Sequence, residues 1–132
     1  MERAYELVLY GATGFPYLIA YAGYTGKLAA RYIYENCPTN LKWAVGGRSR
    51  EKLEKVAGEN RRPGIIVADA DDFEALEALA KSTKVVISVA GPFLKYGSKL
   101  VRACAENGTH YADITGETPW YSSKKANLGF AK

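Results

Sequence analysis

Apolar runs alternate with amphipathic stretches along most of the chain. Five short runs rich in aliphatic residues are expected to be strands, because each is bounded by glycine, proline or polar residues. These runs are residues 6–10, 41–45, 65–68, 84–90 and 111–114. Since they are apolar on both faces, they are typical of a parallel sheet that helices cover on both sides.

Four helices are predicted between these strands from apolar residues at helical spacing. The first covers residues 27–36 and the last covers 98–107, where Gly108 ends it. The second begins at an N-cap, Ser49, and the third at a capping box formed by Asp71 and Glu74. The predicted inward residues are Leu28, Ala29, Tyr32 and Ile33; Leu53, Val56 and Ala57; Phe73, Leu76, Leu79 and Ala80; and Leu100, Val101, Cys104 and Ala105.

This order of elements predicts an α/β fold with a doubly wound, parallel, Rossmann-type sheet. Right-handed crossovers give five strands in the order 3-2-1-4-5, a sheet that is incomplete at its C-terminal edge because it lacks a sixth strand. We expect the domain to occupy residues 1–121 and to be followed by an irregular basic tail, residues 122–132. The exposed edge makes a homodimer a candidate assembly.

Composition narrows the class of protein. A chain of 132 residues with 48% hydrophobic and 24% charged residues is expected to form one globular domain. Its net charge of +4 is scattered and no nucleic-acid motif surrounds it, so we predict no nucleic-acid partner. Cys37 and Cys104 lack the spacing of a metal site or disulfide framework, and Cys104 is expected in the core.

Without a signal peptide or a transmembrane run we expect a cytoplasmic protein, and peripheral association with lipid surfaces stays open.

A glycine turn joins the first strand to the first helix. Gly11-Ala12-Thr13-Gly14 follows the strand, and Tyr24-Thr25-Gly26 opens the helix. Backbone N–H groups and the helix dipole at such a turn bind a pyrophosphate. We therefore predict a dinucleotide site that includes Gly11, Thr13, Gly14, Thr25 and Gly26.

Residues 15–23 split this GxxGxxG turn and are expected to loop out. As helix they would rotate the apolar face by about 900° and carry it away from the sheet. The sequence leaves open whether they form a real loop or are an in-frame gene-model error.

Residues after the later strands indicate which dinucleotide binds. After the second strand, NAD enzymes carry an acidic residue for the ribose 2′-hydroxyl, whereas this chain has Arg48 and Ser49. The guanidinium fork suits a 2′-phosphate, so NADP(H) is the predicted cofactor. Asp69 follows the third strand, where it could contact the adenine amino group or act as a helix cap or solvated carboxylate. Ala90 and Gly91 end the fourth strand, near the second half of the dinucleotide.

These segments together resemble the saccharopine dehydrogenase-like oxidoreductases, a family that includes the trans-acting enoyl reductases of lipid and polyketide assembly. The likeness is carried by the split glycine turn and by residues 44–53, 67–69, 91–97 and 108–117. It implies an NADP-linked Rossmann domain followed by a larger substrate domain that completes the sheet, which is absent from this chain. It also implies cofactor contacts by Gly11, Thr13, Gly14 and Arg48, and less certain ones by Ser49, Asp69, Ala90 and Gly91.

Two functions follow from this sequence. The first is the NAD(P)H-binding part of a truncated oxidoreductase that transfers hydride, with enoyl reduction as one candidate reaction. The second is a non-catalytic or degenerate nucleotide-binding module. The catalytic residues and the substrate are not identified: His110 begins a strand, which favours a structural role, and Asp113 and Glu117 have no assigned role. We predict no metal site.

Overall fold

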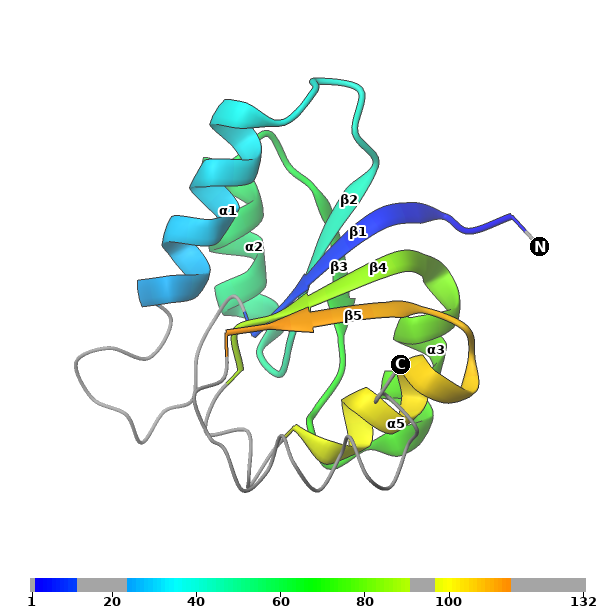
Figure 1. The fold of residues 1–132 in the computed structure, drawn as a ribbon. Coiled ribbons are helices and arrows are strands. Elements are labelled where there is room, and N and C mark those ends of the chain that lie inside the picture. The colour runs from blue at the N-terminus through cyan, green and yellow to red at the C-terminus, as the bar shows by residue number, and fades with distance from the viewer. Residues whose placement is uncertain (1, 12–23, 91–96, 115–132) are drawn as a thin grey trace.

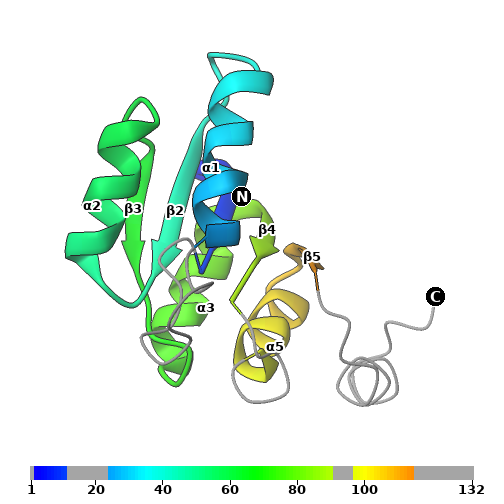
Figure 2. The ribbon, with the colours of Figure 1, turned by 90° about the vertical axis from the view of Figure 1, so that its left-hand side faces the viewer.

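The computed structural model describes residues 2–11, 24–90 and 97–114 and contains one five-stranded parallel sheet (Figure 1). The strands are β1 (Tyr5–Tyr10), β2 (Trp43–Gly47), β3 (Gly64–Val67), β4 (Thr83–Ser88) and β5 (His110–Asp113). Their order is β3-β2-β1-β4-β5, which confirms the predicted topology. Because the strands are parallel, all their carboxyl ends lie along one edge of the sheet. In Figure 2 the arrowhead of β3 points down the page toward this edge.

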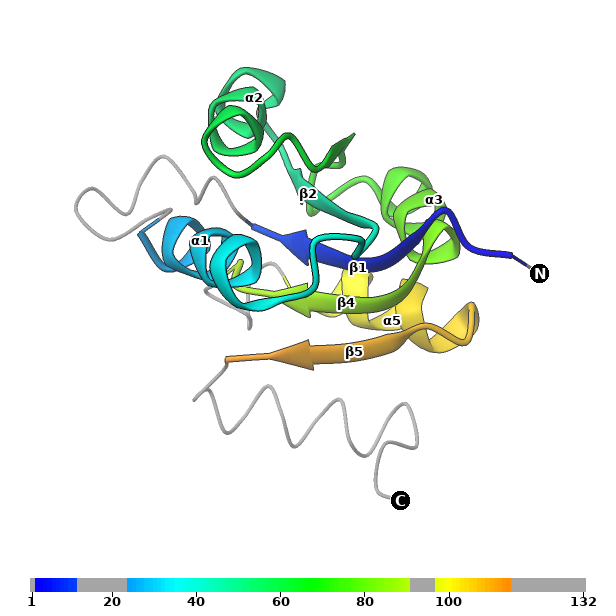
Figure 3. The same ribbon diagram turned by 90° about the horizontal axis from the view of Figure 1, so that it is seen from above.

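Helices cover both faces of this sheet. They are α1 (Tyr24–Asn36), α2 (Arg50–Glu59), α3 (Phe73–Ser82) and α5 (Ser98–Glu106). In Figures 1 and 3, α1 and α2 lie on one face and α3 and α5 on the other. The arrangement is the doubly wound α/β fold.

The core has two halves because side chains of each strand alternate between the faces. Val8 and Tyr10 of β1 point toward α3 and α5, whereas Leu9 points toward α1 and α2. The α3 side includes Ala44, Leu76, Leu79, Val86, Leu100 and Cys104, and the α1 side includes Ala30, Ile33, Val45, Leu53 and Val56. β1 is therefore buried on both faces at the centre of the sheet.

The predicted inward face of α1 is wrong in part. Leu28 and Tyr32 are 50% and 64% exposed, whereas Gly26, Ala30 and Ile33 are buried. The small residues Gly26 and Ala30 let the helix approach the sheet closely, and the larger apolar residues are displaced to its outer side. Size, and not hydrophobicity alone, decides which face is buried.

Two details of the other helices also differ from the prediction. The N-cap of α3 is Asp72, whose carboxylate accepts the N–H of Ala75 at 3.1 Å, and not Asp71. On α5 the buried alanine is Ala103, whereas Ala105 is exposed.

The predicted N-cap of α2 is confirmed, because the Ser49 hydroxyl oxygen accepts a hydrogen bond from the Lys52 N–H. Gly108 has a φ of +65°, as its predicted role at the end of α5 requires.

The strand boundaries lie within two residues of those predicted. The change that matters most for the site is at the end of β2. The sequence predicts a turn at Gly46 and Gly47, but both residues belong to the strand and pair in register with Ile66 and Val67. Parallel pairing depends on backbone groups, which glycine supplies as well as any residue.

Arg3 holds the opposite, amino edge of the sheet together. Its guanidinium donates to the carbonyls of Ala80 and Asn107, both at 2.7 Å, and to the Thr109 hydroxyl at 3.2 Å. The Thr109 hydroxyl in turn donates to Ala80 at 2.6 Å. These carbonyls lie at the C-terminal ends of α3 and α5, where a positive charge is favourable. One side chain thus links two helices.

We predict that Arg3→Met lowers the free energy of unfolding by about 2 kcal/mol, because charge-assisted hydrogen bonds are lost and two helix ends lose their cation. Urea unfolding measures the effect. The matched control is Arg50→Met, on an exposed arginine at the start of α2. An equal, small change in both variants would contradict the linking role of Arg3.

Candidate functional site

The carboxyl ends of four strands meet at one edge, and backbone hydrogen bonds continue past them. The Gly11 N–H donates to the Gly46 carbonyl at 2.8 Å, the Ala68 N–H to Gly47 at 2.8 Å, and the Val89 N–H to Tyr10 at 2.9 Å. Gly11, Arg48, Asp69 and Ala90 each follow one of these strands, so all four lie along this edge, and their contacts with a cofactor stay a prediction. Thr13, Gly14, Gly91 and the segments 15–23 and 122–132 lie outside the described residues.

Gly11 requires the absence of a side chain for two reasons. Its φ is +89°, a left-handed conformation that other residues rarely adopt. A Cβ atom on Gly11 would lie 2.6 Å from the Ala90 Cβ and 2.7 Å from the Ala90 nitrogen. The chain after β1 therefore passes directly against the chain after β4. This point is where the strand order reverses, the usual ligand crevice of doubly wound folds.

α1 begins on the side of the sheet toward which the strand arrows point (Figure 1), so its first turn lies at the carboxyl-edge end of the domain. It contains Thr25, which is exposed, and Gly26, which is buried, and it has no acidic residue. By contrast, the first turns of α2 and α3 contain Glu51 and Glu74. An anion near the start of α1 thus meets the positive end of the helix dipole without a carboxylate from that turn.

Arg48 and Ser49 directly follow β2. Arg48 is exposed, and Ser49 is half-buried with its hydroxyl oxygen accepting the Lys52 N–H at 3.4 Å. The hydroxyl keeps a hydrogen that can be donated to a second acceptor. Ser49 can therefore cap α2 and also contact a phosphate oxygen beside Arg48.

Asp69 lies in the loop between β3 and α3. Its carboxylate accepts the N–H of Asp71 at 2.9 Å, and its carbonyl accepts the N–H of Asp72 at 3.0 Å. Asp72, and not Asp69, is the N-cap of α3, whereas the bond from the Asp71 N–H makes the Asp69 carboxylate cap-like within the loop; its contact with adenine stays a prediction. The loop geometry occupies one carboxylate oxygen of Asp69 and leaves its other oxygen for a ligand.

Tyr10 is a site component that was not identified from the sequence. It is buried, and its hydroxyl donates to the Ala68 carbonyl at 2.8 Å. Burial, and next the negative charge of Asp69, raise the pKa of Tyr10 well above its ordinary value, while Arg48 acts in the opposite direction. The phenol is therefore a neutral hydrogen-bond donor beneath the edge. The sequence feature that could have identified Tyr10 is its place as an aromatic residue at the end of an otherwise aliphatic run in β1.

A buried polar residue, Ser88, lies at the end of β4. The buried Ser88 hydroxyl accepts the Ala90 N–H at 3.3 Å, and Ser88 pairs in register with Asp113 of β5. His110 pairs with Val85, nearer the amino edge, so it does not belong to this site. Cys104 is fully buried, which confirms its predicted place in the core, and this burial raises the pKa of its thiol to about 12.

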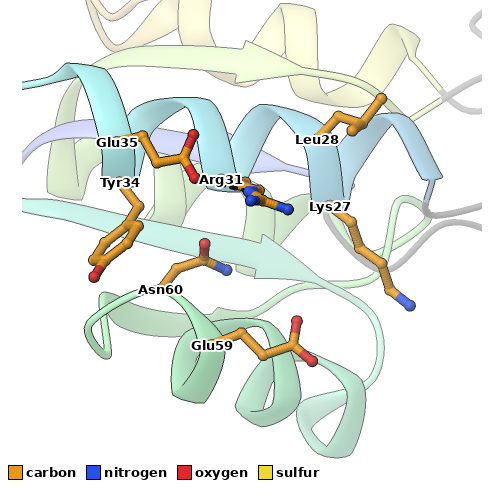
Figure 4. Close-up of a pocket in the computed structure, with 7 residues that line it drawn as sticks. All are labelled: Lys27, Leu28, Arg31, Tyr34, Glu35, Glu59 and Asn60. Carbon is orange, nitrogen blue, oxygen red and sulfur yellow. Dashed lines mark hydrogen bonds and ion pairs between the residues drawn. The ribbon is translucent and has the colours of Figure 1, made fainter.

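The described residues contain no cluster of metal-ligating side chains and no helix capable of crossing a membrane. The groove between α1 and α2 in Figure 4 has a volume of about 460 Å³. Its lining residues are Lys27, Leu28, Arg31, Tyr34, Glu35, Glu59 and Asn60. Arg31 and Glu35 pair within it at 2.8 Å, and both are exposed. Apart from Lys27 in the first turn of α1, the groove is lined by the rest of α1 and by the C-terminal end of α2, and it is not part of the candidate site.

Comparisons with known proteins agree with this geometry. Residues 18–129 match the model of the saccharopine dehydrogenase NADP-binding domain. A trans-acting enoyl reductase of Mycobacterium leprae is 42% identical over 120 residues, which cover 88% of this chain and 26% of that protein. A saccharopine dehydrogenase-like oxidoreductase of Mus musculus is 38% identical, covering 88% of this chain and 28% of that protein. The chain therefore spans about a quarter of the length of these relatives.

Solved structures share the fold at lower identity. Apo saccharopine dehydrogenase (L-Glu forming) from Saccharomyces cerevisiae matches with a TM-score of 0.72 and 16% identity, over 91% of this chain and 24% of that one. A Citrobacter triphenylmethane reductase complexed with NADP(H) matches with a TM-score of 0.67 and 16% identity, over 93% of this chain and 46% of that one.

The contact of Gly11 with Ala90 predicts opposite effects for two glycine substitutions. Gly11→Ala should lower the free energy of unfolding by about 2–3 kcal/mol, because it adds both backbone strain and overlap. Gly58→Ala is the control: Gly58 lies in α2, where an added Cβ would have no neighbour within 4 Å, so the variant should gain about 0.5–1 kcal/mol. Chemical denaturation measures both. A stable Gly11→Ala variant would contradict the close approach.

Proposed function

Because the chain belongs to the saccharopine dehydrogenase NADP-binding domain family, we propose that it holds NADP(H) at the carboxyl edge of its sheet as the cofactor-binding part of an oxidoreductase. The observation that carries this proposal is the convergence of Gly11, Arg48, Asp69 and Ala90 on that edge. Each of these residues comes from the end of a different strand.

The cofactor has complementary groups at each position. The first turn of α1 offers backbone N–H groups that lack helical partners to the pyrophosphate. Arg48 offers its guanidinium fork, and Ser49 its hydroxyl hydrogen, to the 2′-phosphate. Asp69 accepts the adenine amino group. Thr13, Gly14 and Gly91 complete the set on the basis of the sequence.

The chemistry of the proposed enzyme is hydride transfer, which bound NADPH supplies. Ala90 and the end of β4 border the side of the crevice where the reacting ring would lie. Substrate contacts would come from a further domain, since the relatives are about four times as long as the region that matches. Reduction of an enoyl substrate is the proposed reaction, supported by the names of the relatives.

Location and assembly are also proposals. Cys37 and Cys104 are both free thiols, as is typical of proteins in a reducing compartment, so we propose a cytoplasmic location. β5 is an edge strand of the described sheet. A homodimer through that edge is the proposed assembly.

A non-catalytic nucleotide-binding module is the second candidate. It is favoured by the placement of two side chains that could transfer a proton: His110 pairs with Val85 toward the amino edge, and the Cys104 thiol is fully buried in the core. NADPH binding without reductase activity in the longest natural form of the chain would support the module over the enzyme.

Arg48→Asp should weaken NADPH binding by about 1.5–3 kcal/mol and improve NADH binding relative to it, because the phosphate loses its cation and the ribose hydroxyl gains an acceptor. Fluorescence titration measures both affinities. The control is Lys84→Glu, which makes the same change in net charge at an exposed residue near the amino end of β4. Unchanged NADPH affinity in Arg48→Asp would exclude Arg48 as the selector.

Deletion of residues 15–23 is expected to tighten NADPH binding and raise the melting temperature. The deletion rejoins Gly14 to Tyr24 and restores a compact GxxGxxG turn, and it removes the ordering entropy of an apolar loop. The buried face of α1, formed by Gly26, Ala30 and Ile33, keeps its register with the sheet. Calorimetry on both chains gives the answer; a deletion variant that binds no better would show that the segment is accommodated by the site.

A further inference from the structure

The Tyr10 side chain crosses a neighbouring strand to reach the loop that holds Asp69. Tyr10 of β1 pairs in register with Gly46 of β2, and a Cβ on Gly46 would lie 3.3 Å from the Tyr10 ring and 3.1 Å from Leu79. The ring therefore occupies the space above Gly46, under α3. Its hydroxyl then reaches the Ala68 carbonyl, just beyond the end of β3.

The Asp69 loop is held at several points, and Tyr10 is the one that comes from the centre of the sheet. The Ala68 N–H is bonded to Gly47, and the Asp69 carboxylate and carbonyl accept the N–H groups of Asp71 and Asp72. On the outer side, the Lys99 ammonium donates to the Asp71 carbonyl at 2.8 Å. The Tyr10 hydroxyl donates to the carbonyl of the peptide group that directly precedes Asp69.

We propose that Tyr10 is a positioning residue for the adenine end of the cofactor: its hydroxyl orients the Ala68–Asp69 peptide and so aims the Asp69 carboxylate at the adenine amino group. This inference rests on the proposed function. Tyr10 touches no ligand, and it acts only through Ala68 and Asp69.

A phenylalanine at residue 10 would fill the same space between Gly46 and Leu79. The hydroxyl is thus not needed to complete the core, and its removal isolates the positioning effect from packing. The matched control is Tyr32→Phe, because Tyr32 is 64% exposed on the outer side of α1. A change specific to Tyr10→Phe therefore reports on the bond to Ala68.

The test compares two dinucleotides by titration of the full chain. One is NADPH, and the other is its hypoxanthine analogue, in which a carbonyl replaces the adenine amino group. Tyr10→Phe and Asp69→Asn should each lower NADPH affinity about three- to tenfold, the loss expected for one hydrogen bond. Tyr10→Phe should alter binding of the analogue by no more than about twofold, whereas Asp69→Asn should strengthen it, because the asparagine amide can donate to the carbonyl of the analogue. The double variant should lose no more NADPH affinity than Asp69→Asn alone.

A measurement without nucleotide tests the same contact independently. In the free protein, hydrogen exchange of residues 68–72 should be faster in Tyr10→Phe than in the wild-type chain, while that of α5 stays unchanged. Tyr32→Phe should change neither segment.

The outcomes separate this proposal from the proposed function. If the wild-type chain bound neither dinucleotide, the proposed function and this inference would both fail. If the wild type bound NADPH but Tyr10→Phe weakened both dinucleotides equally, or neither, the proposed function would stand and the positioning role would be wrong. Unchanged exchange of residues 68–72 in Tyr10→Phe would also overturn it.

Discussion

The contact between Gly11 and Ala90 is the constraint on which the carboxyl edge depends. The chain leaves β1 toward β2 and β3 on one side, and β4 and β5 lie on the other, so a crevice opens between β1 and β4. Only a glycine with positive φ lets the two strand ends touch there. The backbone bonds that follow, from Gly11 to Gly46 and from Val89 to Tyr10, keep the neighbouring strand ends in register.

Opposite charges are arranged around this contact on one side of the crevice. Arg48 follows β2 and Asp69 follows β3, which are neighbouring strands, and the Tyr10 hydroxyl is bonded to the Ala68 carbonyl directly before Asp69. A cation suited to a phosphate and a carboxylate suited to an amino group thus follow adjacent strands, as the proposed binding of a 2′-phosphorylated adenosine requires. Gly46 allows the Tyr10 side chain to cross β2 toward Ala68, because a Cβ atom at residue 46 would crowd the Tyr10 ring.

The sheet order, the alternation of elements and the residues at the strand ends could all be predicted, because they follow from apolar periodicity and glycine turns. The inward face of α1 could not, since Leu28 and Tyr32 outweigh Gly26 and Ala30 in hydrophobicity although the small residues are buried. The N-cap of α3 is Asp72, although Asp71 was predicted, because the sequence does not distinguish two adjacent aspartates as caps. Tyr10 was missed because its partner, Ala68, is 58 residues away in the chain.

The carboxyl edge, and no other surface of the described residues, is the proposed NADP(H) site. Amide chemical shifts recorded by NMR during titration with NADPH distinguish it from every other surface. We predict changes at residues 46–49, 68–69 and 88–90 and at the first turn of α1, with none at Arg3 or residues 60–64 on the amino side. Changes centred on Arg31, Tyr34 and Asn60, which line the groove between α1 and α2, or on the amino edge, would contradict this assignment.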